Sequence, residues 1–249
     1  MIVLPLRSSA GSRRLQLVTQ TDHAAFSAEV LSLWREDGLP GNPRRQALLR
    51  GTREHDNGWA EADSAPRRRE DGVPHDFRSI PREVRLEIFQ RAVLRKAEED
   101  PEAWVYVVRH ARELHRGDPS DEAWDEALDH WLELEDELRA KAGLTEEELA
   151  ADYRYLQIAD SLSLTACLRR SEPQRVCGVR MFVREDAASE RDPGMAITLH
   201  LEPFPFAGST TFQVRCRVIP DRYYSGDADL AVELATARWQ DLQIRVARH

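Results

Sequence analysis

The stretch "TREHDNGWAEADSAP" (residues 52–66) places a histidine, an aspartate, an asparagine, a glycine and a tryptophan next to one another. A surface loop tolerates the polar residues but does not need the tryptophan, and a core helix does not need a histidine beside a carboxylate. Asn57-Gly58 predicts a turn directly after His55-Asp56. We therefore expect the His-Asp doublet at the end of a helix, where both side chains can face one cavity.

The composition is that of an ordinary globular protein, with 41% hydrophobic and 32% charged residues in a chain of 249. The net charge of -9 argues against broad affinity for nucleic acid or an anionic membrane. The apolar runs are too short for a signal peptide or a transmembrane helix. We expect a cytoplasmic protein with a small-molecule substrate and no nucleic-acid or membrane partner. The cysteines are odd in number, lack zinc-ligand spacing and are expected to be reduced core residues: Cys167, Cys177 and Cys216.

From about residue 21 to about residue 168, apolar residues recur at the spacing of amphipathic helices. Capping residues and prolines divide this region into six predicted helices. Their expected starts are Thr21 or Asp22, Asn42, Pro81, Asp100, the segment from residue 119, and Thr145 with Glu148 as a capping box. The Gly- and Pro-rich residues 57–81 are expected to form one long irregular connection.

After about Arg170 the pattern changes to the alternation of half-buried strands. Strands are predicted over residues 176–183, 194–206, 210–220 and 242–249, and a short helix over residues 227–237. The sequence thus predicts a mainly α protein. A helical bundle is expected over residues 1–170, and a carboxyl-terminal α+β extension over residues 171–249 is expected to pack a small antiparallel sheet on it.

Histidines and carboxylates occur on separate predicted helices. His23 lies in the first, His55 and Asp56 end the second, His110 lies in the fourth and Asp160 in the sixth. Facing helices can bring such side chains to one point. Imidazole and carboxylate ligands suit iron, manganese, zinc or nickel, and burying these groups without an ion is costly unless they are paired. We therefore predict a site for one or two divalent transition-metal ions.

This order of residues resembles the HD-domain superfamily of metal-dependent phosphohydrolases, whose signature is a histidine, a His-Asp doublet and a final aspartate on a helical bundle. From about residue 16 to its end, the chain more closely resembles a bacterial family of unknown function, DUF3891. The matching segments are "QTDH" (20–23), "EHDNGW" (54–59), "GVPHDF" (72–77), "RHARELH" (109–115), "LQIADSLSL" (156–164) and "LEPFPF" (201–206), of which "EHDNGW" is the most specific.

The superfamily resemblance implies one metal bound by His23, His55, Asp56 and Asp160, with His110 extending the site to a second metal or a substrate phosphate. It implies a metal-dependent hydrolase of a phosphoester or nucleotide-like small molecule, in which Asp56 and His110 have catalytic roles. Two alternatives stay open. One is a di-iron oxygenase, in which His75 and His110 supply further ligands, and the other is a non-catalytic module that binds a metal or a ligand.

Further residues are expected next to the ligands, as pocket residues or as groups that orient an imidazole. They are Asp22, Glu54, Trp59, Asp63, His75 and Gln157. His115 lies at a predicted helix end, where a cap is expected. The sequence leaves open which of His75, His110 and His115 complete the site.

Overall fold

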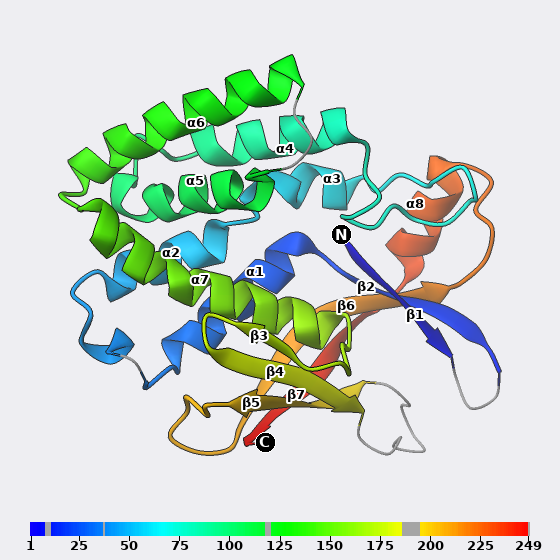
Figure 1. The fold of residues 1–249 in the computed structure, drawn as a ribbon. Helices are drawn as coiled ribbons and strands as arrows, with labels where there is room; N and C mark the ends of the chain where they lie inside the picture. Colours follow the sequence, from blue (N-terminus) through cyan, green and yellow to red (C-terminus); the bar gives the residue numbers. More distant parts are fainter. Residues whose placement is uncertain (8–10, 37, 118–120, 186–194, 249) are drawn as a thin grey trace.

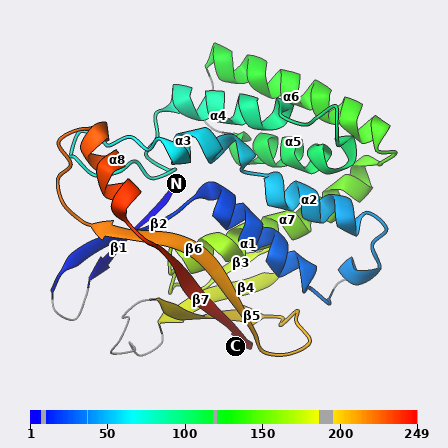
Figure 2. The ribbon, with the colours of Figure 1, turned by 180° about the vertical axis from the view of Figure 1, so that it is seen from behind.

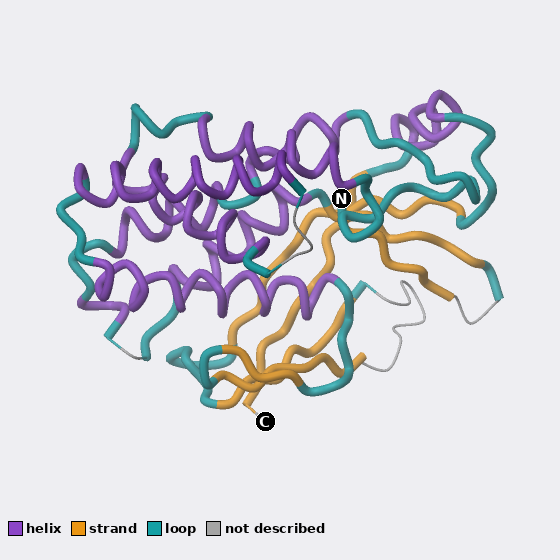
Figure 3. The backbone as a smooth tube through the Cα atoms, turned by 45° about the horizontal axis from the view of Figure 1, so that its top comes forward, coloured by secondary structure: helices purple, strands orange, loops and turns teal. Residues whose placement is uncertain are grey.

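The computed structural model describes residues 1–7, 11–36, 38–117, 121–185 and 195–248. In this part of the chain, a layer of helices covers one face of a twisted seven-stranded sheet (Figure 1). A tilted view coloured by secondary structure shows the same separation of helices and strands (Figure 3). None of the described helices is long and apolar enough to cross a membrane.

The helices before residue 168 are α1 (Gln20–Ser32), α2 (Arg45–Glu54), α3 (Ala60–Ser64), α4 (Arg82–Leu94), α5 (Pro101–His115), α6 (Glu122–Lys141) and α7 (Glu146–Cys167), with 3-10 turns η1 (Leu39–Gly41) and η2 (Asn57–Trp59). Apart from α3 and the 3-10 turns, these helices lie where the apolar periodicity predicts them. The caps of α5 and α7 are confirmed, because the side chains of Asp100 and Thr145 accept backbone N–H groups there. The cap of α1 is Thr19, whose hydroxyl accepts the amide of Asp22, so the expected start was two to three residues late.

The predicted connection over residues 57–81 is only partly irregular, because η2 and α3 occupy its first third. The turn at Asn57-Gly58 packs directly under α4. A Cβ at Gly58 would lie 2.1 Å from the backbone oxygen of Ile88, so only glycine fits this approach. The amide of Asn57 donates to the carbonyl of Glu54 at 2.7 Å and thereby closes the turn.

The sheet contains β1 (Ile2–Arg7), β2 (Arg13–Val18), β3 (Gln174–Val176), β4 (Val179–Glu185), β5 (Ala196–Glu202), β6 (Thr210–Pro220) and β7 (Trp239–Arg248). Its order is β1-β2-β6-β7-β5-β4-β3, with β5 and β7 parallel and the other neighbours antiparallel. Helix α8 (Asp227–Thr236) lies between β6 and β7 in the sequence. Residues 119, 120, 194 and 249 of the predicted elements lie outside the described residues.

The predicted fold class, a mainly helical bundle with a small antiparallel sheet, is therefore wrong. The sheet is large and mixed, and its first two strands come from the amino end of the chain. The β1–β2 hairpin continues the sheet because β2 pairs with the end of β6, with Leu15 opposite Ile219. This pairing covers backbone groups of β6 that would otherwise form an open edge.

Alternating side chains give the sheet two faces. Phe212, Val214 and other buried residues of β4–β7 pack under the helices, and Phe26 of α1 meets Phe212 edge-on at 5.4 Å. On the β1–β2 hairpin, Ile2 belongs to this main core, whereas Val3 packs with α8 in a second, smaller apolar cluster. The view from behind shows α8 at the hairpin end of the sheet (Figure 2).

Cys167 and Cys216 are buried and form no disulfide, as expected of reduced core residues. Cys177 is exposed in the turn between β3 and β4, so the expectation of a core position is wrong for this residue. A turn of this tightness brings Cys177 to a positive φ of 47°.

Candidate metal centre

Four helices bring the predicted ligands together. His23 comes from α1, His55 and Asp56 from the end of α2, His110 from α5 and Asp160 from α7. They form two overlapping groups, His23–His55–Asp56 and His55–His110–Asp160, and within each group the possible ligand atoms lie within 4.8 Å of one another. The contacts between these helices thus create the convergence that the sequence predicted.

The imidazole of His55 is held in one tautomer. His55 follows the last residue of α2, and its Nδ1 lies 2.6 Å from the carbonyl oxygen of Thr52. Because a carbonyl only accepts, Nδ1 carries the proton, and Nε2 has the lone pair in the neutral ring. This Nε2 is buried without a hydrogen-bond partner among the described residues. Oxygens of Asp56 and Asp160 lie 3.6 Å from it, beyond hydrogen-bonding distance.

The imidazole of His23 is oriented in the same way by a serine. The hydroxyl of Ser163 donates to the backbone oxygen of His23 at 3.1 Å and lies 2.6 Å from His23 Nδ1. Since the hydroxyl hydrogen is used, Ser163 accepts from Nδ1. In the neutral ring Nε2 of His23 then carries the lone pair, and once protonated it donates to Asp160 at 2.9 Å, with Asp56 3.9 Å away.

Two imidazole lone pairs therefore face two carboxylates in a buried site. The lone pairs and the carboxylate charges repel one another unless protons or a metal ion lie among these atoms. Burial alone would lower the pKa of His55, but the charges of Asp56 and Asp160 raise this pKa to about 9. Burial alone would raise the pKa of Asp160, but His23 and His55 hold it well below its usual value.

The donor set fits a divalent transition metal. Imidazole nitrogens with the proton fixed on the other ring nitrogen, together with carboxylate oxygens, are the usual ligands of such ions. The hydrogen bonds to Thr52 and Ser163 are of the kind that orient the imidazoles in metal sites. Burial raises the pKa of Asp56, which is the sign of a carboxylate that gains from a nearby cation.

His110 completes the cluster as a neutral imidazole. Its ring meets that of His55 edge-on, with the centroids 4.7 Å apart. Its Nδ1 lies 3.2 Å from the hydroxyl of Tyr153. Burial and the neighbouring His55 lower the pKa of His110 to about 3, so it carries no charge at neutral pH.

A cavity of about 280 Å³ opens above the cluster. His23, Asp56, His110 and Asp160 form part of its lining, and the rest is mostly apolar or aromatic. His115, for which the sequence predicted a cap, is buried and also lines the cavity. Its ring lies against Phe89 at 4.6 Å and Trp124 at 4.5 Å.

Three further residues predicted near the ligands, Trp59, His75 and Gln157, lie at different places in the structure. Trp59 is buried and lines the cavity, as expected of a pocket residue. His75 lines a separate cavity, with its Nδ1 3.3 Å from the hydroxyl of Ser79. Gln157 accepts from the thiol of Cys177 at 3.5 Å.

The three acidic residues predicted near the ligands make hydrogen bonds through a side chain or the backbone. Asp22 accepts the hydroxyl of Thr19 at 2.7 Å and so helps to cap α1. Asp63 accepts the backbone amide of Gln20 at 2.6 Å. Glu54 supplies its backbone carbonyl to the turn after α2. None of these hydrogen bonds involves an imidazole of the cluster.

Several residues of the site were not predicted. Ser163 and Tyr153 lie three residues after and seven residues before Asp160, so they share its helix face, and this spacing is a usable signal. Arg78 and Arg85 line the cavity from the loop before α4 and from α4 itself. Nothing in the sequence spacing connects these two arginines with the ligands.

No curated protein and no solved structure matches the sequence. One family model matches residues 7–221, which is most of the chain and includes every residue of the cluster. The chain therefore belongs to DUF3891, a family of proteins of unknown function.

Proposed function

We propose that this protein is a metal-dependent hydrolase of the HD type that cleaves a phosphoester or nucleotide-like small molecule. The observation that carries the proposal is the meeting of two imidazole lone pairs with two carboxylates beside a cavity. The order of these residues along the chain, which is that of the HD signature, also supports it. We place the enzyme in the cytoplasm, with a small-molecule substrate and no nucleic-acid or membrane partner.

The ion is assigned to His23, His55, Asp56 and Asp160, with His110 binding a second ion or a substrate phosphate. Iron, manganese, zinc and nickel all suit these donors. When bound, one or two such ions supply Lewis acidity, which polarises a phosphoryl group and makes water more acidic.

The chain's own groups then have distinct tasks. The carboxylate of Asp56 accepts a hydrogen bond from the attacking water and orients it. His110 is neutral because burial and the neighbouring His55 lower its pKa, so its imidazole keeps a lone pair with which to bind an ion or to accept a hydrogen bond. In net terms, the water oxygen bonds to phosphorus, the bond from phosphorus to the alcohol oxygen breaks, and a water proton passes to that oxygen.

The oxygenase alternative gains no support from the position of His75. That residue would have to supply a further ligand, but it lines another cavity and lies beside Ser79. The non-catalytic alternative uses the same cluster as the hydrolase and differs from it only in turnover.

Hydrolysis of p-nitrophenyl phosphate and bis-p-nitrophenyl phosphate with added Mn²⁺ tests the proposal. Asp56→Asn is expected to lower kcat by about a hundredfold or more. His130→Ala is the matched control, because His130 is an exposed histidine on α6. Bound metal without hydrolysis of any mono- or diester would contradict the hydrolase and favour a binding module. A coloured, air-sensitive protein with two irons would favour the oxygenase.

A further inference from the structure

The cavity above the cluster combines three kinds of surface. Its floor is the His/Asp cluster, one wall is aromatic and apolar with Trp59 and Phe89, and Arg78 and Arg85 also line it. A phosphate needs only the floor and the arginines. The aromatic residues therefore indicate that the ligand has an organic group beside its phosphate.

The two arginines are placed to receive an anion. Nε of Arg78 donates to Asp76 at 2.6 Å, which fixes the side chain and leaves its terminal nitrogens without a hydrogen-bond partner among the described residues. Nε of Arg85 is buried and has no hydrogen-bond partner among the described residues. A guanidinium offers a planar fork that matches the oxygens of a phosphate.

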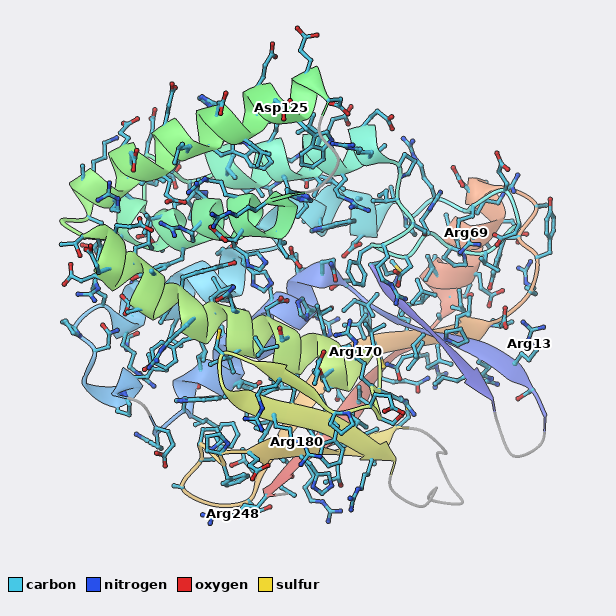
Figure 4. All side chains as sticks on the ribbon, viewed as in Figure 1. Arg13, Arg69, Asp125, Arg170, Arg180 and Arg248 are labelled. Carbon is cyan, nitrogen blue, oxygen red and sulfur yellow. The ribbon has the colours of Figure 1, made fainter. Side chains whose placement is uncertain are left out.

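A third arginine, Arg170, is not part of the cavity lining but is close enough to Arg78 for the two charges to interact. Arg170 follows the end of α7 (Figure 4). Burial and the neighbouring charge of Arg78 lower the pKa of Arg170. A dianionic group bound here would be attracted by this concentration of cations.

The aromatic wall is built for a flat group. Trp59 and Phe89 meet edge-on with their centroids 6.4 Å apart, and His115 packs against Phe89 from the other side. Two polar atoms of this wall, Nε1 of Trp59 and Oε1 of Gln20, are buried without a hydrogen-bond partner among the described residues. Both residues are 3% exposed and line the cavity. Such atoms are expected to bind a polar substituent of a ligand.

The volume limits the size of that ligand. A cavity of about 280 Å³ lies at the small end of the range for small-molecule sites. It has room for one ring with its phosphate, whereas a dinucleotide would extend out of it.

We propose that this cavity binds a phosphate monoester that carries a single aromatic or heteroaromatic ring. The phosphate lies between the cluster and Arg78 and Arg85, and the ring lies against Trp59 and Phe89. This inference rests on the proposed function, of which it names the substrate class. It concerns binding, however, and so it can be tested without turnover.

Calorimetric titration of the protein, purified without chelator, with phenylphosphonate and with methylphosphonate provides the test. Both probes carry the same anion and neither is hydrolysed. The ring is expected to improve the affinity about tenfold. Arg78→Gln and Arg85→Gln are each expected to weaken both probes about tenfold. Arg53→Gln, an exposed arginine on α2, is the control and should leave both affinities unchanged.

A substitution at Leu114 tests whether the ring binds in the cavity, and it leaves the buried residues unchanged. Leu114 is 46% exposed and lines the cavity. Leu114→Trp is expected to fill the space for the ring and to reduce the affinity for phenylphosphonate to that for methylphosphonate. Equal affinities for both probes in the wild type, or unchanged affinities in both arginine variants, would overturn the inference.

Hydrolysis separates this inference from the proposed function. A protein that prefers phenylphosphonate but does not hydrolyse phenyl phosphate would support the binding site and contradict the hydrolase. A protein that hydrolyses phenyl phosphate and glycerol 2-phosphate with equal kcat/KM, and binds both phosphonates equally, would overturn the ring site and leave the hydrolase standing.

Discussion

Nε2 of His23 lies 2.9 Å from a carboxylate oxygen of Asp160, although the two residues are 137 positions apart in the chain. Ser163 holds the proton of His23 on the other ring nitrogen, so the atom that faces Asp160 is an acceptor. In the neutral ring two acceptors therefore face each other, and the pair needs either a proton on Nε2, which then donates to Asp160, or a metal ion beside both atoms. This relationship is the physical basis for the proposed metal site.

Ser163→Ala is expected to weaken metal binding without removing a ligand. Loss of the hydroxyl frees the imidazole of His23 to rotate and change tautomer, and such outer contacts contribute about 10- to 100-fold in metal affinity. Competition titration with a chromogenic chelator measures the effect. Ser161→Ala on the same helix is the control, and equal affinities of the two variants would contradict the orienting role.

Gly58→Ala is expected to destabilise the protein by about 1–3 kcal/mol, because the added methyl would overlap the backbone of α4. Urea unfolding measures the change in the free energy of unfolding. Gly41→Ala serves as the control, since a Cβ at Gly41 meets nothing within 4 Å. A loss no greater than that of the control would show that α4 does not pack on the turn in this way.

Asp152→Asn is expected to cost about 2–4 kcal/mol of stability. The buried carboxylate accepts from Asn42 at 2.5 Å, from Arg44 at 2.7 Å and from the hydroxyl of Tyr106 at 2.9 Å. An amide would place donors against these donors. Thermal unfolding provides the comparison.

Glu137→Gln is the matched control for Asp152→Asn, because it removes only an exposed pair with Lys141. If both variants melt at the same temperature, the buried carboxylate does not hold α5, α7 and the segment before α2 together.

Alkylation by iodoacetamide is expected to modify one of the three cysteines in the folded protein. Burial raises the pKa of the Cys167 thiol to about 12, which lowers its thiolate fraction at pH 8, and Cys216 is buried as well. Cys177 is exposed and should react. Mass spectrometry after labelling identifies the site. Labelling that persists in Cys177→Ser under native conditions would contradict the burial of the other two.

The helices could be predicted from sequence because their signals are local. Thr145 and Glu148 cap α7 within one turn, and Asp100 and Pro101 do the same for α5. The β1–β2 hairpin was missed because its partner is β6, about two hundred residues later in the chain. The alternation of Leu15 and Leu17 with polar neighbours was a weak signal that the hairpin was present.

The residues of the cluster could be predicted because the chain has only eight histidines and because His55-Asp56 stands directly before the Asn57-Gly58 turn. The cavity wall could not be predicted in the same way. Arg78 and Arg85 reach the cavity only because the loop before α4 folds over the site, and that path depends on tertiary contacts such as the bond from the amide of Val3 to Asp76.

The metal content of protein purified without chelator tests the proposed site most directly. Wild type and His130→Ala are expected to carry about one or two divalent transition-metal ions per chain, because His130 lies outside the cluster. His55→Ala and Asp160→Ala are expected to carry little or none. Equal and negligible metal in the wild type and in all three variants would contradict the proposed metal centre.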